Sequence, residues 1–273
     1  MILIRRTHVA LALSLVAAIA ARTSAQTMAA APQTSASAES RPEPESNVRL
    51  QALVGFGAGT RSFYRPTRDG AQELPETAFP VLDVGVRARL WPEARFSLTA
   101  LVRYQTSVGF VVEEPALFAL PTELGVRDEH LEAGIAPTFR FGKGPMSPGL
   151  ALPMGVMWRA FVSHAYMQKT PSYSLAGPHL RAELQLPISN ALQLRVGPEL
   201  QWLVAIKGTI RPDGVAATGV ALGAEASLQL QITDRFGVEL MLRQSSAFAS
   251  GKSGQADFED VERFAIMSLS GSL

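Results

Sequence analysis

Alternation of apolar and polar residues at every second position recurs through most of the chain, and it restricts the fold more than any other feature. The stretch LDVGVRARLW, residues 82–91, is typical. A period of two gives a strand two different faces. Soluble sandwiches and membrane barrels both have such strands, so the rest of the sequence must decide which face is turned to water.

Ten segments carry this alternation, and none of the chain has a convincing helical period of 3.6. A strand in a soluble protein averages about 5–6 residues, whereas a tilted strand needs about 9–11 to cross a bilayer. Most of the segments have 11 residues or more: 48–63, 79–91, 96–112, 129–141, 150–166, 173–186, 192–206, 215–232, 236–246 and 261–273. Because closure removes exposed strand edges, the sequence predicts an all-β fold, a closed antiparallel transmembrane β-barrel of about ten strands.

The connections between these segments alternate in length. Those after the second, fourth, sixth and eighth segments are short (PEAR, GKGPMSPG, PISNA and TDR), and others are long, such as YRPTRDGAQELPETA. MQKTPS and KGTIRPDG fit the alternation less well. The trend is typical of a membrane barrel in which every other turn lies on the same side. An even number of strands then places both termini in the periplasm.

The N-terminal residues have the pattern of a secretory signal. Arg5 and Arg6 precede an apolar run from Val9 to Ala21, and Thr23-Ser24-Ala25 supplies small residues for cleavage. The sequence therefore predicts a signal peptide over 1–25, a disordered Ala/Ser/Pro-rich leader over 26–47 and a barrel over 48–273. We expect export to the bacterial outer membrane.

Composition excludes several classes of protein. The chain has no cysteine, so it has no disulfide, no thiolate metal site and no acylated cysteine. Its net charge of +1 gives no electrostatic reason to expect nucleic acid as a partner. No cofactor motif and no metal-ligand spacing is found.

The polar face of the strands predicts a network of ion pairs inside the barrel. Pairing the apolar residues beside each short turn, such as Leu90 with Phe96, sets an acid opposite an arginine in all four short hairpins. Side chains directly opposite are about 4.5–5.5 Å apart at Cβ, close enough to interact. The expected pairs are Asp83–Arg103, Glu132–Arg159, Glu183–Arg195 and Glu225–Arg243, with His179 opposite Glu199.

A barrel of this size has little free space. An interior of about eight strands is filled by side chains, and a wide aqueous channel needs about sixteen. The inward positions of the second to ninth segments carry six acids and nine basic residues. We therefore expect a lumen that is plugged by charged side chains rather than a general porin.

The chain resembles the small bacterial outer-membrane β-barrel superfamily. The resemblance covers 48–273 and rests on the signal peptide, the loop rhythm and alternation such as LDVGVRARLW and LQLRVGPELQWLV. It implies outer-membrane lipid and lipopolysaccharide as surroundings, the barrel-insertion machinery as a partner, and a monomer.

Some barrels are enzymes, and the candidate sites for catalysis are weak. Ser163 and His164 are neighbours on a strand and point to opposite faces. The His-x-Ser pattern of barrel lipid A deacylases is absent. The omptin proteases use an acidic pair and an Asp/His pair at the rim, whereas Asp83 has no second acid two residues away. His179 with Glu199 is more simply part of the lumenal network.

The sequence therefore favours a non-enzymatic outer-membrane barrel with a charge-filled lumen and a structural or surface-interaction role. Two alternatives stay open. One is a narrow channel for small solutes, and the other is a lipid- or peptide-processing hydrolase at the rim.

Overall fold

The computed structural model describes residues 48–67, 70–92, 95–114, 122–142, 144, 146–163, 172–208, 218–250 and 258–272. The expected signal peptide (1–25) and leader (26–47) lie outside the described residues. Nowhere in the described ranges does the chain form a helix with the length and hydropathy needed to cross a membrane.

Within these ranges the chain forms one antiparallel sheet of fourteen strands. The strands are β1 (Val48–Thr67), β2 (Gly70–Leu90), β3 (Phe96–Ser107), β4 (Phe110–Glu114), β5 (Thr122–Arg140), β6 (Gly149–Ala151), β7 (Met154–Ser163), β8 (Tyr173–Arg181), β9 (Glu183–Pro187), β10 (Leu192–Leu203), β11 (Ala205–Gly208), β12 (Thr218–Gln231), β13 (Phe236–Ser250) and β14 (Phe258–Ser272).

Four of these strands continue a neighbour in the sequence across a short interruption. β3 and β4 both pair with β5, as do β6 and β7, while β8 and β9 both pair with β10. β10 and β11 in turn both pair with β8. Joined in this way, the described strands make ten long strands.

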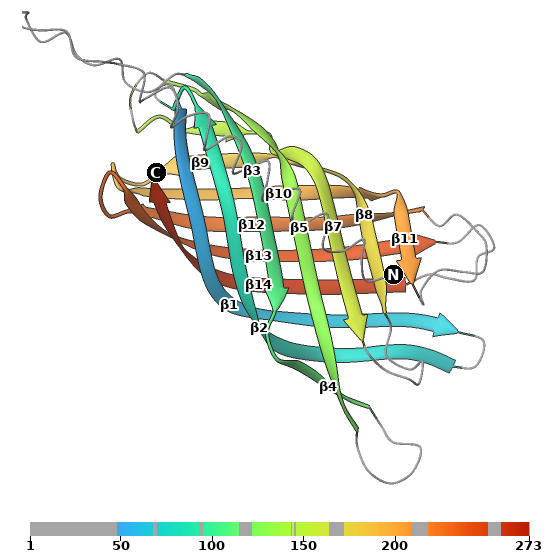
Figure 1. The fold of residues 1–273 in the computed structure, drawn as a ribbon. Helices are drawn as coiled ribbons and strands as arrows, with labels where there is room; N and C mark the ends of the chain where they lie inside the picture. The colour runs from blue at the N-terminus through green and yellow to red at the C-terminus, as the bar shows by residue number, and fades with distance from the viewer. Residues whose placement is uncertain are drawn as a thin grey trace, which may run out of the picture. The chain divides into compact units, whose positions relative to one another are not determined.

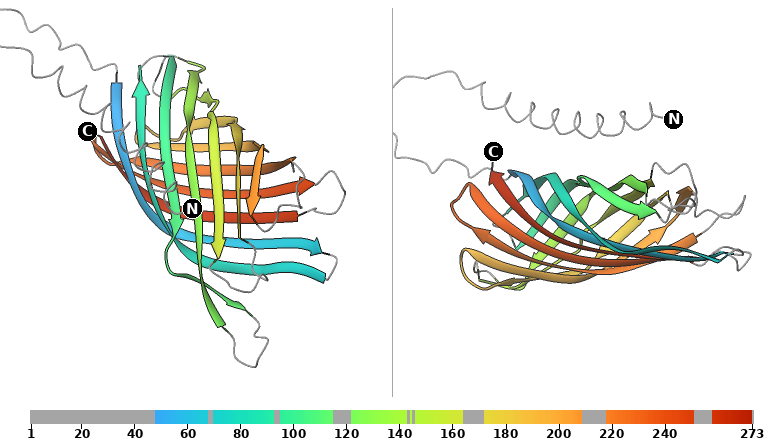
Figure 2. Two further views of the ribbon diagram at one scale, coloured as in Figure 1. Left: turned by 45° about the vertical axis from the view of Figure 1, so that its right-hand side comes forward. Right: turned by 90° about the horizontal axis from the view of Figure 1, so that it is seen from below.

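The sheet closes on itself because β1, the first strand, pairs with β14, the last, over fourteen residue pairs. Figure 1 shows the long strands running round one barrel, with β1 beside β14, and Figure 2 shows the same ring from two other directions. The expected closed, antiparallel, ten-stranded barrel is therefore confirmed.

The turn between β12 and β13 has the register that the sequence predicts. The N–H of Ile232 donates to the carbonyl oxygen of Phe236 at 2.9 Å, which closes a turn of three residues. The hydroxyl of Thr233 accepts from the N–H groups of Arg235 (3.3 Å) and Phe236 (3.1 Å). Serine and threonine side chains often bond to the backbone of a turn in this way.

In the other three short hairpins the predicted register is wrong by two residues. Leu90 lies opposite Leu98 rather than Phe96. Leu150 lies opposite Phe139 rather than Phe141, and Leu186 lies opposite Leu194 rather than Leu192.

The third of these hairpins shows the physical reason for the shift. The hydroxyl of Ser189 accepts from the N–H groups of Ala191 (3.3 Å) and Leu192 (3.1 Å), so the chain turns in three residues instead of five. A shift of two residues keeps every side chain on its own face of the sheet. The assignment of inward and outward residues therefore survives all three errors.

The outward face is apolar over a band that fits a bilayer. The outward residues of β1 from Val48 to Ala58 are all apolar, over 11 residues. Phe56, Phe236 and Leu269 are 61%, 61% and 63% exposed. The band ends where polar residues take over the outward positions, at Thr60 on β1 and Arg263 on β14.

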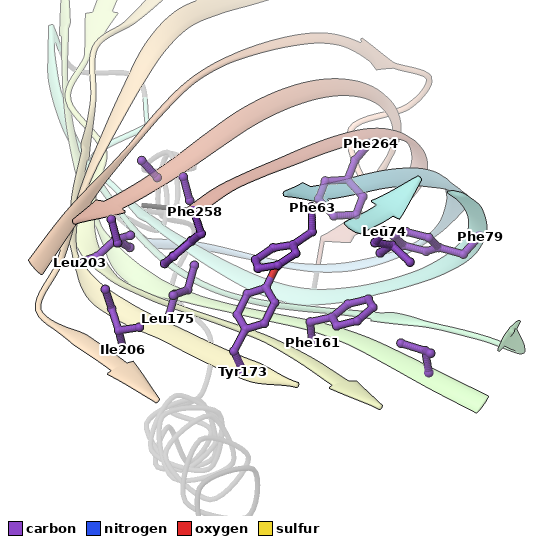
Figure 3. Packing of buried hydrophobic residues seen from close by; sticks show 14 of the residues in the cluster. Phe63, Leu74, Phe79, Phe161, Tyr173, Leu175, Leu203, Ile206, Phe258 and Phe264 are labelled. Carbon is purple, nitrogen blue, oxygen red and sulfur yellow. The ribbon is translucent and has the colours of Figure 1, made fainter. Parts of the chain in front are cut away.

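The inward face is divided along the barrel. Toward the long loops it holds an apolar cluster that includes Phe63, Phe161, Tyr173 and Phe258. The ring centroids of Phe63 and Tyr173 are 5.3 Å apart, and Figure 3 shows the two rings meeting inside the barrel. Below this apolar cap, the middle of the lumen is filled by charged side chains.

A β-bulge at Val204 separates β10 from β11. Leu200 lies opposite Leu180, but after Val204 the register with β8 changes by one residue, so that Ile206 lies opposite Leu175. Gly177 on β8 faces this bulge, and a Cβ atom there would collide with the carbonyl oxygen of Trp202. The bulge therefore depends on a residue without a side chain.

We expect Gly177→Ala to lower the free energy of unfolding by about 1–3 kcal/mol, because the backbone of β10 must move away from the added methyl group. Gly125→Ala on β5 is the control, since nothing lies within 4 Å of its added Cβ. Thermal and urea unfolding in detergent, followed by circular dichroism, compares the two. Equal stability of both variants would contradict this account of the bulge.

Candidate functional site in the barrel lumen

The ten residues expected to form the lumenal network all have side chains on the inward face. Arg195 and Glu225 are partly exposed toward the short-turn end. The other eight are buried, at 8% exposure or less: Asp83, Arg103, Glu132, Arg159, His179, Glu183, Glu199 and Arg243.

Asp83 and Arg103 form a two-pronged ion pair. Arg103 donates from Nε to Oδ1 of Asp83 at 2.7 Å and from Nη2 to Oδ2 at 2.8 Å. Asp83 also accepts from the hydroxyl of Ser268 at 2.8 Å. The pair is diagonal, because Arg103 lies opposite Gly85 and Asp83 lies opposite Gln105. The long side chain of Arg103 reaches across this two-residue offset.

The expected pair Glu132–Arg159 is replaced by other partners. Because the hairpin is shifted by two residues, Arg159 lies opposite His130 and Glu132 lies opposite Met157. Arg159 Nη1 lies 3.3 Å from Oε2 of Glu262, on the far side of the lumen. Glu132 instead lies 3.1 Å from Nη2 of Arg181.

The proposed dyad of His179 and Glu199 is also corrected. Glu199 lies opposite Arg181, and His179 lies opposite Gln201. The carboxylate nearest to His179 is that of Glu132, 3.8 Å from its Nε2. Among the described residues, neither ring nitrogen of His179 has a hydrogen-bond partner.

The remaining expected pairs form only in part. Nε of Arg195 lies 3.9 Å from Oε1 of Glu183, at the outer limit of an ion pair. Glu225 lies opposite Arg243, but its carboxylate binds Arg181. Arg243 in turn places Nη2 at 2.6 Å from Oε1 of Glu199.

The central network is therefore shared rather than pairwise. Arg181 contacts Glu132, Glu199 and Glu225, three acids from three different long strands. An arginine presents five N–H donors in a planar fork, which suits this multiple role. These acids lie on both sides of the strand that carries Arg181, so its contacts link β5, β10 and β12.

A second group of charges, not expected from the sequence, lies beneath the apolar cap. We call it the Arg61 cluster, and it consists of Arg61, Asp128, His130, Asp260 and Glu262. Arg61 is fully buried and lies 2.7 Å from Asp128, 2.6 Å from Asp260 and 2.8 Å from Glu262.

The aromatic cap covers the Arg61 cluster directly. The guanidinium carbon of Arg61 lies 5.0 Å from the ring centre of Phe161 and 5.2 Å from that of Tyr173. Nη2 of Arg61 also donates to the hydroxyl oxygen of Tyr173 at 3.0 Å. Cation–π contacts of this kind gain strength when water is excluded.

The signal for the Arg61 cluster was present in the sequence. Arg61, Asp260 and Glu262 occupy inward positions of the first and last strands, whereas the inward charges counted from the sequence belong to the second to ninth segments. Asp260 lies just before the expected last segment, 261–273, but inside β14, which begins at Phe258. Asp128-x-His130 is an Asp/His pair, and Asp260-x-Glu262 is an acidic pair. These are the two kinds of pair that the omptin proteases use at the rim. Asp83 itself is fully buried.

The short-turn end of the lumen contains a cavity of about 520 Å³. Seven arginines and five acids contribute to its wall. Arg49 and Arg89 lie directly opposite each other on β1 and β2. Arg49 donates to Ser272 Oγ at 3.2 Å and to the carbonyl oxygen of Asp234, and Arg140 donates to the carbonyl oxygen of Pro92 at 2.8 Å. The mouth of this cavity is therefore basic.

Of the other expected catalytic candidates, His164 lies outside the described residues. Ser163, its neighbour, ends β7.

No protein-family model and no curated protein sequence matches the chain. Among solved structures, the chain is similar to the outer membrane protease OmpT from Escherichia coli, with 8% identity, a TM-score of 0.48, and coverage of 82% of this chain and 97% of that one. It is similar to the translocator domain of the autotransporter NalP from Neisseria meningitidis (12% identity, TM-score 0.40, covering 84% and 90%). A third similar structure is the COG4313 outer membrane channel from Pseudomonas putida F1, with 8% identity, a TM-score of 0.35, and coverage of 85% of this chain and 100% of that one.

A protease, a translocator and a channel share little beyond architecture. What the structure of this chain shows by itself is the closed ring of ten long antiparallel strands.

We expect Arg103→Ala to lower the free energy of unfolding by about 3–5 kcal/mol, because it leaves the buried carboxylate of Asp83 without its cation. Chemical denaturation of the folded barrel in detergent measures the loss. The double variant Asp83→Ala with Arg103→Ala should recover part of it.

The matched control is Arg263→Ala, which breaks a pair on the outward face. Arg263 and Glu76 are 2.6 Å apart but 46% and 54% exposed, so their pair should contribute little to the free energy of unfolding. Hydrogen bonds from Thr60 and from Arg263 hold the pKa of the Glu76 carboxyl below its usual value. If Arg263→Ala lowers the free energy of unfolding as much as Arg103→Ala does, burial does not explain the contribution of the lumenal pair to stability.

Proposed function

We propose that this chain is a non-enzymatic outer-membrane barrel whose lumen is closed, with a structural or surface-interaction role. What supports a place in the membrane is the outward face, since 11 residues of apolar outward positions on β1 match the length that a tilted strand needs to cross a bilayer. Lipid and lipopolysaccharide are then its surroundings, and the barrel acts as a monomer.

The observation that carries the closed lumen is the presence of two successive layers inside it. The Arg61 cluster and the central network occupy the middle, with Arg61, Asp83 and Asp260 fully buried. The aromatic cap of Phe63, Phe161, Tyr173 and Phe258 lies beyond them. An ion that crosses would have to break buried ion pairs and then pass through an apolar layer, and both steps are costly.

The narrow-channel alternative draws on the cavity at the short-turn end. That cavity reaches inward as far as Glu132, His179 and Arg181, all of which belong to the central network. It has the form of a vestibule that ends at this network. A channel would need the network to rearrange.

The hydrolase alternative draws on the Asp/His and acidic pairs of the Arg61 cluster. His130 is 5% exposed, and Asp128 and Glu262 are each 1% exposed. Each carboxylate also contacts Arg61, which holds it as the partner of a cation rather than as a free base. The rings of Phe161 and Tyr173 lie over Arg61 and cover these groups.

Conductance in planar bilayers tests the closed lumen. We expect the purified chain to give no stable large conductance, because both layers block the path. The triple variant Phe63→Ala, Tyr173→Ala and Phe258→Ala removes the cap and serves as the positive comparison, with more frequent openings. Stable conductance of the wild-type chain would rule out the proposal and favour the channel.

Cysteine labelling tests the orientation, in which the short turns and both termini face the periplasm. The chain has no cysteine of its own, so single substitutions can be labelled cleanly. On intact cells, a membrane-impermeant maleimide should label Glu73→Cys, at the long-loop end of β2, and leave Asn190→Cys, in the short turn after β9, unlabelled. After the outer membrane is opened, both should react. Labelling of Asn190→Cys alone on intact cells would reverse the orientation.

A further inference from the structure

Three side chains of metal-ligand type meet inside the Arg61 cluster. Asp128 and His130 project from β5, and Glu262 projects from β14. Nε2 of His130 lies 3.4 Å from Oδ1 of Asp128 and 3.3 Å from Oε2 of Glu262. β3, β2 and β1 separate β5 from β14 in the sheet, so these residues meet across the lumen.

The spacing of these atoms fits a single tetrahedral ion. Zinc binds imidazole nitrogen and carboxylate oxygen at about 2.0–2.2 Å, and tetrahedral ligand atoms at that distance are about 3.3–3.6 Å apart. The two measured separations, 3.4 Å and 3.3 Å, lie in this range. One ligand atom from each of the three residues lies within 4.8 Å of the other two.

His130 points independently to a missing partner. Its side chain is buried, and neither ring nitrogen has a hydrogen-bond partner among the described residues. Buried polar side chains nearly always have such partners. Nε2 of His130 lies 3.4 Å and 3.3 Å from carboxylate oxygens of Asp128 and Glu262, and it forms a hydrogen bond with neither of them.

The charges of the cluster are also out of balance. Arg61 is the cation in contact with all three of the carboxylates Asp128, Asp260 and Glu262. Arg159 lies 3.3 Å from Glu262 but is shared with Glu199, at 3.8 Å. Buried anions need compensating charge, and a divalent cation beside His130 would supply it.

We propose that Asp128, His130 and Glu262 bind one divalent transition-metal ion, for which zinc is the best fit. The imidazole ligand separates this site from calcium and magnesium sites, which use oxygen ligands alone. Three protein ligands leave a fourth tetrahedral position for water. The ion is structural, because it lies beneath the aromatic cap and joins β5 to β14 across the lumen.

Metal content of the folded chain tests the site. The full chain, carrying an affinity tag without histidine, is extracted from outer membranes in detergent and washed free of loose metal. Inductively coupled plasma mass spectrometry should find about one zinc per chain. Replacement by cobalt(II) should give the intense visible absorption of tetrahedral coordination.

His130→Gln should abolish this stoichiometric binding and the cobalt absorption. The matched control is His179→Gln, which alters the other histidine among the described residues, also buried and 3.8 Å from a glutamate. That variant should keep the metal. Circular dichroism and the heat dependence of gel mobility show whether each variant is folded.

Chelation of the wild-type chain keeps the test decisive even if His130→Gln fails to fold. Removal of the metal should lower the unfolding temperature, and zinc should restore it while calcium does not. Wild-type chain that retains no zinc after exposure to it would overturn the proposal and leave His130 as a protonated partner of the two carboxylates. Metal retained by a folded His130→Gln variant would overturn it equally.

Discussion

The exclusion of charge from the apolar band of the outer face is the constraint on which the rest of this structure depends. A barrel wall whose outward positions are apolar must turn its acids and arginines inward, where water is scarce and each charge needs an opposite one. Arginine meets this need best, because one guanidinium bonds to several carboxylates at once. Arg61 and Arg181 each contact three acids; those of Arg61 lie on β5 and β14, and those of Arg181 lie on β5, β10 and β12. The ion pairs therefore connect strands that are not neighbours in the sheet as well as strands that are.

The architecture was predictable from the sequence because it depends on periodicity and length. A period of two fixed which residues face inward, and ten segments of spanning length predicted ten long strands. The face assignment was robust even where the register was not, since a slip of two residues returns a side chain to the same face. The register itself depended on turn chemistry. The hydroxyls of Thr233 and Ser189 accept hydrogen bonds in three-residue turns in the same way. The register predicted from the sequence is correct only for the turn that contains Thr233.

The partners inside the lumen were less predictable, for a geometric reason. Pairing across a hairpin relates neighbouring strands, whereas Arg61 on β1 meets Asp128 on β5, and Arg159 on β7 meets Glu262 on β14. No local pattern in the sequence gives the distance across a barrel. The diagonal pair of Asp83 and Arg103 forms in spite of its shifted register because the long side chain of Arg103 spans the offset.

The cavity at the short-turn end has a consequence for the chemical environment of the whole interior. In the closed barrel that we propose, the basic mouth of this cavity opens at the short-turn end, and the aromatic layer of Phe63, Phe161, Tyr173 and Phe258 lies toward the long loops. The interior of such a barrel would exchange protons and small ions with one compartment. In the proposed orientation that compartment is the periplasm, so the arginine-lined cavity would take the pH and the ionic composition of the periplasm.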